Sequence, residues 1–130
     1  MSITEGESQT YTRTFTPEEV RAFAELSRDT QPQHVETDDD GRLVVHGLLT
    51  ATLPTKIGGD LEVLATRMDL SFRDQVYTGQ EIVCTWTHES VTEREDRYEL
   101  TVDITCRRTA DRSVVLDGEI EGLVWKDDSE

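Results

Sequence analysis

Lysine is nearly missing from this chain. Only Lys56 and Lys126 stand among its 13 basic residues, against 28 acidic residues, so the formal net charge is −15. A surface of this sign repels the phosphate backbone, which argues against nucleic acid binding. The acids are spread along the chain, which indicates adaptation to high salt. At 1 M salt, the repulsion between acidic side chains is screened beyond about 3 Å. The plainer alternative is an ordinary acidic soluble protein.

Long apolar runs are also missing. No stretch approaches the roughly 18 apolar residues that a membrane-spanning helix needs. The first ten residues, MSITEGESQT, are polar and acidic, and they lack the basic and then apolar order of a signal peptide. We therefore expect a cytoplasmic protein without a membrane partner.

Cysteine is scarce, and the sequence offers no metal-binding pattern. Cys84 and Cys106 lie far apart in strand-like runs, without a CxxC motif or histidines at ligand spacing. This favours buried free thiols over a disulfide or a metal site. The acidic run at residues 38–40 lacks the spaced ligands of a calcium loop, so it predicts a solvated turn.

The length of 130 residues fits one domain with a single core. Residues 1–9 are expected to be a disordered tail, and residues 10–126 the domain. Alternation at Thr10–Phe15 predicts a short strand. The segment Thr16–Glu19 is typical of a capping box with proline at the first helical position, which predicts a helix from Pro17 to Ser27.

The rest of the chain changes from helical to strand periodicity. The apolar segment Leu48–Ile57 predicts a buried helix that ends at Gly58 and Gly59, with Pro54 as an awkward member. Period-two alternation then predicts long strands with short connections, most simply antiparallel. A helix against such a sheet is an α+β architecture. The strands are expected at Leu61–Phe72, Glu81–Ser90, Tyr98–Cys106 and Val114–Trp125.

Two short motifs carry candidate chemistry. Asp29 and His34 flank Pro32 directly after the first helix. A carboxylate and an imidazole can hold one water, with one group taking a proton while the other gives one. Gly47 follows His46 at the start of the buried helix, where a free N–H can bind a carbonyl oxygen that gains negative charge. The alternatives are a helix-terminal aspartate, a surface histidine and, for His46, a residue that shapes the turn.

The segments FAELSRDTQPQH, VVHGLLTATL and LSFRDQVYTGQEI, in this order, resemble the MaoC-like dehydratases and (R)-specific enoyl-CoA hydratases. The resemblance runs from about Phe15 to Trp125. It implies a hot-dog fold, in which an antiparallel sheet wraps around a central helix, here Leu48–Ile57, and a homodimer or higher oligomer. Gln31 stands where the family usually has asparagine, and the stretch from His34 to His46 is shorter than in the hydratases.

The resemblance also implies an activity, the reversible hydration of a trans-2-enoyl thioester to an (R)-3-hydroxyacyl thioester. The substrate would be an acyl-CoA or acyl-carrier thioester, without a metal or redox cofactor, in fatty acid metabolism or polyhydroxyalkanoate precursor supply. Asp29 and His34 match the catalytic pair, and the Gly47 N–H matches the donor to the thioester carbonyl. Substrate-pocket candidates are His46, Leu48 and Thr55, the last of which falls where some relatives carry serine.

Two other functions remain open on the same fold. One is an acyl-CoA thioesterase, although that chemistry does not need an Asp/His pair. The other is a non-catalytic module that binds acyl thioesters. The basic cluster Arg107, Arg108 and Arg112 either contacts the phosphates of a CoA or carrier arm or forms surface salt bridges.

Overall fold

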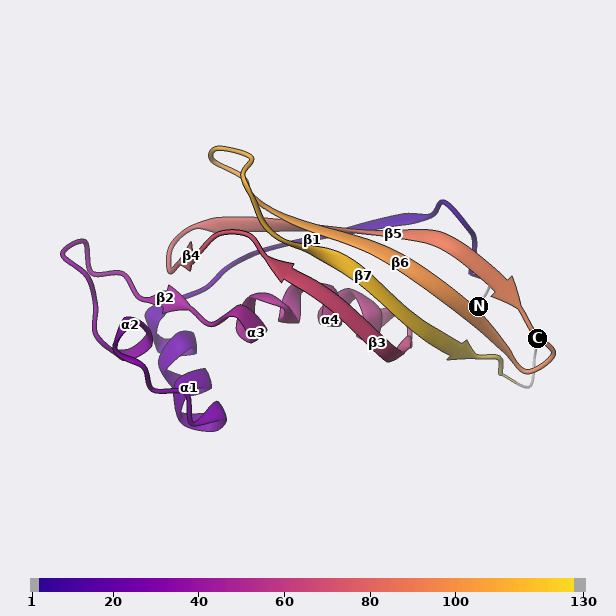
Figure 1. Ribbon diagram of the computed structural model, residues 1–130, viewed down its shortest axis with the longest axis horizontal. Helices are drawn as coiled ribbons and strands as arrows, with labels where there is room; N and C mark the ends of the chain where they lie inside the picture. Colours follow the sequence, from indigo (N-terminus) through magenta and orange to yellow (C-terminus); the bar gives the residue numbers. More distant parts are fainter. Residues whose placement is uncertain (1–2, 128–130) are drawn as a thin grey trace.

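The structure is a computed structural model that describes residues 3–127. A long antiparallel sheet curves over a central helical segment, and two further helices lie beyond one end of the sheet (Figure 1). The α+β architecture predicted from the sequence is thereby confirmed. The strands of the sheet, in spatial order, are β1 (Ser8–Thr14), β5 (Glu81–Glu93), β6 (Arg97–Arg108), β7 (Val114–Trp125) and β3 (Leu64–Phe72).

The remaining elements lie at one end of the large sheet or under it (Figure 1). A small two-stranded sheet pairs β2 (Val44–Val45) with β4 (Val76–Tyr77). The helices are α1 (Pro17–Ser27), α2 (Pro32–Val35), α3 (Gly47–Thr50) and α4 (Thr52–Asp60). None of the helices in the described part of the chain has the length and apolar character needed to cross a membrane.

The core forms where the sheet faces the central helices. Alternate residues of β5 and β6 point inward, as their period of two predicts, and Trp86 is buried against Gly58 of α4. Cys84 and Cys106 are cross-strand partners, and both are buried free thiols, as predicted. The hydrogen bond with Cys84, together with burial, raises the pKa of the Cys106 thiol, so this thiol is not a nucleophile at neutral pH.

The central helix differs from the single helix expected at Leu48–Ile57. It is divided at Ala51 into α3 and α4, and α4 continues through both glycines to Asp60. Pro54 explains the division, because it has no N–H for the carbonyl of Thr50 and its ring would clash there. After the break, Pro54 falls in the first turn of α4, where its missing N–H needs no partner.

The N-terminal segment is more ordered than the sequence predicted. Disorder was expected through residue 9, yet β1 begins at Ser8 and Ile3 is buried. The backbone N–H of Gly6 donates to the carbonyl of His88, and the N–H of His88 donates to Glu7. These bonds extend the β1–β5 pairing beyond the strand, which alternation in residues 1–9 did not reveal. Residues 1 and 2 lie outside the described range.

Two other boundaries also differ from expectation. The strand expected from Leu61 begins at Leu64, because Leu61 and Val63 donate backbone bonds to the end of α4 and close that helix. The connection between β3 and β5, where no strand was expected, contains β4, which pairs with β2. This connection leads from β3, at one edge of the large sheet, to β5, which lies next to the strand at the opposite edge.

Candidate active site

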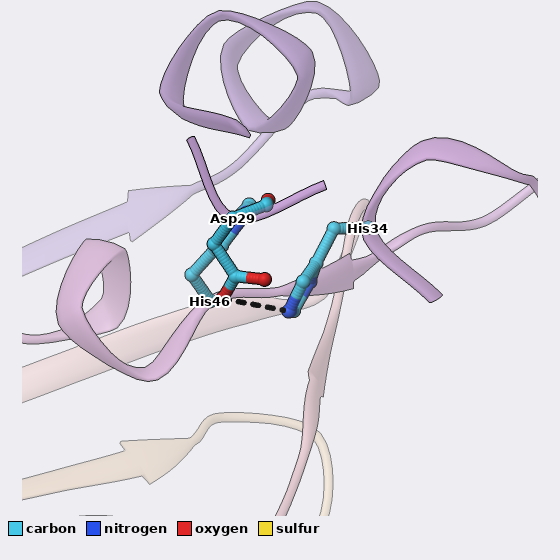
Figure 2. A group of neighbouring side chains, drawn as sticks. All are labelled: Asp29, His34 and His46. Carbon is cyan, nitrogen blue, oxygen red and sulfur yellow. Dashed lines mark hydrogen bonds and ion pairs between the residues drawn. The ribbon is translucent and has the colours of Figure 1, made fainter. Parts of the chain in front are cut away.

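The predicted pair lies where α1 ends and α2 begins. Arg28 caps α1 in the left-handed conformation, with φ 68°, and turns the chain so that Asp29 follows outside the helix. Pro32 then starts α2, which carries His34 back toward Asp29. Asp29 Oδ2 lies 3.8 Å from His34 Nε2, and the two side chains meet with His46 in Figure 2. This distance leaves the two groups close enough to share one water.

Asp29 is held by a neighbour whose role the sequence did not reveal. The side-chain Nε2 of Gln31 donates to Asp29 Oδ1 over 2.9 Å, and the backbone N–H of Gln31 reaches the same oxygen at 3.4 Å. The Gln31 side-chain hydrogen bond lowers the pKa of Asp29 below its ordinary value. Asp29 is therefore a carboxylate, with Oδ2 facing His34.

His34 is fixed from the other side. Its Nδ1 lies 2.7 Å from the carbonyl oxygen of Val44, which can only accept, so Nδ1 carries the proton. In the neutral ring Nε2 is then the bare nitrogen, and this atom faces Asp29. The imidazole is 6% exposed, so its position is set by packing as well as by the bond.

His46 contacts both members of the pair. Its ring stacks on that of His34, with centroids 3.6 Å apart and planes inclined by 15°. Its Nε2 lies 3.0 Å from the carbonyl oxygen of Asp29, whereas Nδ1 is buried without a partner. The sequence predicted His46 as a substrate-pocket residue, with a residue that shapes the turn as the alternative; its ring stacks on His34 and is not part of the lining of the cleft described below.

Asp29, His34 and His46 also carry atoms that can bind a metal ion, and these atoms lie within 4.8 Å of one another. Imidazole lone pairs lie in the ring plane, however, and the planes of His34 and His46 are nearly parallel. The lone pairs therefore run side by side and do not converge on one ion, and the His46 Nε2 is already engaged. The geometry favours handling of water and protons over chelation.

A cleft of about 420 Å³ opens beside His34. Gly47 lines it, and a Cβ at this position would lie 2.8 Å from the Phe72 ring, so a larger residue would require the half-exposed Phe72 ring to move. The Gly47 N–H is the first of α3 and has no intrahelical acceptor. The opposite wall comes from Phe72 and the connection after β3, residues 73–76, which sequence reasoning did not connect with the site.

The other pocket candidates lie elsewhere. Thr55 lines a second cavity, of about 190 Å³, between α4 and β3, together with apolar groups such as Met68 and Trp86. Leu48 lines neither cavity, and it is 67% exposed. Both cavities lie between the α3–α4 segment and β3, and Thr55 lines the second of them, whereas His34 lines the first.

The basic cluster is engaged within the protein. Arg108 bonds Asp74 at 2.7 Å and Asp111 at 3.1 Å, and Arg107 donates to the carbonyl of Arg112. This arrangement supports the alternative of surface salt bridges over a phosphate contact.

No family model matches this chain. It is 29% identical over 121 residues to the mitochondrial 3-hydroxyacyl-[acyl-carrier-protein] dehydratase of Arabidopsis thaliana, covering 87% of this chain and 72% of the relative. An (R)-hydratase from A. caviae involved in PHA biosynthesis superposes with TM-score 0.79 and 27% identity, covering 96% of this chain and 98% of that chain. A MaoC-like dehydratase from Rhodospirillum rubrum gives TM-score 0.78 at 18% identity, covering 96% and 94%.

These likenesses agree with the geometry of the site. The sheet wrapped around a central helix is the fold of the (R)-hydratase, with nearly complete coverage of both chains. Two relatives above 25% identity are named as a hydratase and a dehydratase, activities that are the two directions of one type of reaction. The chain thus has the hot-dog fold, and its similarity to hydratases and dehydratases supports a hydro-lyase activity.

Proposed function

We propose that this protein reversibly hydrates trans-2-enoyl thioesters to (R)-3-hydroxyacyl thioesters. The observation that carries the proposal is the 3.8 Å distance between Asp29 Oδ2 and His34 Nε2. The other oxygen of Asp29, Oδ1, accepts a hydrogen bond from Gln31, and the other nitrogen of His34, Nδ1, donates one to Val44. Similarity to an (R)-hydratase and to a 3-hydroxyacyl-[acyl-carrier-protein] dehydratase supports the substrate class and the (R) configuration.

The mechanism follows from the protonation of the pair. A water held between Asp29 and His34 attacks the β-carbon of the enoyl thioester, and its proton passes to the Asp29 carboxylate. That proton passes from Asp29 to the bare Nε2 of His34, and the resulting imidazolium gives it to the α-carbon, so one water has been added across the double bond. Asp29 Oδ2 and His34 Nε2 lie close enough to exchange this proton, and both groups return to their starting states. The same steps in reverse remove water.

We expect the substrate to lie between the helices and β3, where the cleft beside His34 and the second cavity are found. Gly47 N–H donates to the thioester carbonyl as negative charge develops on its oxygen. The acyl chain then runs toward the apolar cavity that Thr55 lines, and the CoA or carrier arm leaves past residues 73–76. These groups require neither a metal nor a redox cofactor.

The reaction class is tested by two readouts on one sample. Crotonyl-CoA is incubated with the protein in molar salt, while loss of enoyl absorbance and release of free thiol are followed in parallel. The proposal expects loss of absorbance without thiol. Thiol release would indicate a thioesterase, and binding of the thioester with neither change would indicate a non-catalytic module.

The pH dependence tests the role of Gln31. Its hydrogen bond lowers the pKa of Asp29, so the carboxylate persists to lower pH than for an ordinary aspartate. Gln31→Leu removes this bond, which raises the Asp29 pKa. We therefore expect the acidic limb of kcat/KM against pH to move to higher pH. Gln33→Leu is the control, because Gln33 contacts Gln31 but not Asp29. An unmoved limb in Gln31→Leu would show that Asp29 does not set it.

We further propose a homodimer built on β3. This strand is at the edge of the sheet, and Met68 and Phe72 face the concave side with 44% and 53% of their surface exposed. A second copy would cover both the apolar side chains and the open edge. Met68→Glu is expected to give monomers by light scattering, whereas Thr10→Glu on β1, at the opposite edge, keeps the dimer. A dimeric Met68→Glu protein would place the interface elsewhere.

We also propose that the protein is adapted to high salt. Asp69, Glu119 and Asp103 lie directly opposite one another on β3, β7 and β6, and like charges in this arrangement destabilise a sheet. Screening shortens from about 10 Å at 0.1 M to about 3 Å at 1 M. The Tm is expected to rise with KCl, and Glu119→Gln should raise the Tm at low salt and reduce this rise. A Tm that does not respond to KCl would contradict the proposal.

A further inference from the structure

We propose that His46 is a positioning residue that holds Asp29 and His34 in a fixed arrangement relative to one another. The inference rests on the proposed function, since the role it assigns is to orient the two groups that act on water. His46 is not among the residues that line the cleft beside His34, and its contacts are with His34, the backbone of Asp29 and Phe23. We therefore expect its effect on the reaction to pass through the pair.

The first contact is a hydrogen bond that fixes the tautomer of His46. A backbone carbonyl only accepts, so His46 Nε2 carries the proton that it donates to Asp29 over 3.0 Å. Nδ1 is then the bare nitrogen, and it lies buried without a donor. The bond ties the backbone of Asp29, in the exposed turn after α1, to the residue that precedes α3.

The second contact is the stack with His34. Two nearly parallel rings with centroids 3.6 Å apart restrict the tilt of the His34 imidazole, while its Nδ1–H bond to Val44 restricts its rotation. Phe23 packs edge-on against His46, with centroids 4.8 Å apart, and supports the ring from α1. His46 is 3% exposed, so it has little freedom to give way. One side chain thereby sets both the Asp29 backbone and the His34 plane.

Two substitutions separate the contacts. His46→Gln keeps an N–H near the position of Nε2 but loses the ring, whereas His46→Phe keeps a ring against His34 but leaves the Asp29 carbonyl without its donor. Misplacement of a reacting group by about 1 Å lowers the rate on the order of 10²-fold. We expect each variant to lower kcat by up to this factor with KM little changed, and each to retain more activity than His46→Ala.

His88→Gln is the matched control. His88 is also a fully buried histidine whose Nδ1 bonds a carbonyl, that of Thr4, but it lies on β5 away from the pair. It is expected to lower the free energy of unfolding while leaving kcat unchanged. If kcat in the His46 variants matches the unsubstituted protein, or if KM rises while kcat stays, the positioning role is overturned.

A spectroscopic readout judges the inference separately from the activity. Nitrogen-15 NMR of the histidine rings is expected to show neutral His46 protonated on Nε2 and neutral His34 protonated on Nδ1. A His46 ring protonated on Nδ1 would overturn the inference even in an active enzyme. Absence of hydration with every enoyl thioester, beside the expected tautomers, would instead overturn the proposed function and leave the contacts of His46 established.

Discussion

Asp29→Asn is expected to lower kcat for enoyl-thioester hydration by about 10²–10⁴-fold, the range for loss of a general acid or base. Asparagine has nearly the same shape, and its amide oxygen can still accept the bond from Gln31. It cannot take the proton of the attacking water, however. Steady-state kinetics with crotonyl-CoA in molar salt measures the loss, and an unchanged unfolding transition shows that the fold is retained.

A second aspartate provides the control for this substitution. Asp38 also accepts local hydrogen bonds, from the backbone and side chain of Arg42, but it lies in an exposed turn away from the pair. Asp38→Asn makes the same chemical change and is expected to leave kcat as it was. If Asp29→Asn retained the activity of the Asp38→Asn protein, the carboxylate would not be the base.

Gly118→Ala is expected to lower the free energy of unfolding by about 3 kcal/mol, the upper end for overpacking. A Cβ on Gly118 would lie 2.1 Å from the backbone oxygen of Asp69, and a backbone atom cannot swing aside as a side chain can. β3 must therefore separate from β7 at this point. Because β3 ends in Phe72, which packs on Gly47, the change also loosens the wall of the cleft. Denaturant unfolding measures the loss.

Gly59→Ala is the matched control for a glycine substitution. Nothing lies within 4 Å of a Cβ at Gly59, and the residue is an exposed member of α4. Alanine there is expected to stabilise the protein by about 0.5–1 kcal/mol, because glycine is unfavourable inside a helix. Equal unfolding midpoints for Gly118→Ala and the unsubstituted protein would show that the β3–β7 approach is wider than described.

Local patterns predicted the elements whose signals lie within one turn or one strand. The capping box at Thr16 and Glu19 forms as expected, and α1 runs from Pro17 to Ser27. The strand from Val114 to Trp125 also has its predicted bounds, since its alternation is set by one buried face. The break at Ala51 was missed because Pro54 acts on the carbonyl of Thr50, four residues earlier in the chain.

The site shows the same division between local and long-range information. Asp29 and His34 could be predicted together, because Pro32 starts a single helical turn that brings one toward the other. The stack of His46 on His34 could not, since it depends on how α2 and the start of α3 pack. The part of the cleft wall formed by residues 73–76 could not be predicted either. It depends on the pairing of β3 with β7, because the connection from β3 to β5 must then cross the end of the sheet.

The measurement that tests the account most directly is the hydration rate of the double variant Asp29→Asn/His34→Ala beside the two single variants. Groups that act as a unit on one water give non-additive losses. The account therefore predicts that the double variant loses little more kcat than the more damaged single variant, in protein that remains folded in molar salt. Losses that multiply, or single variants as active as the unsubstituted protein, would contradict a water-activating pair.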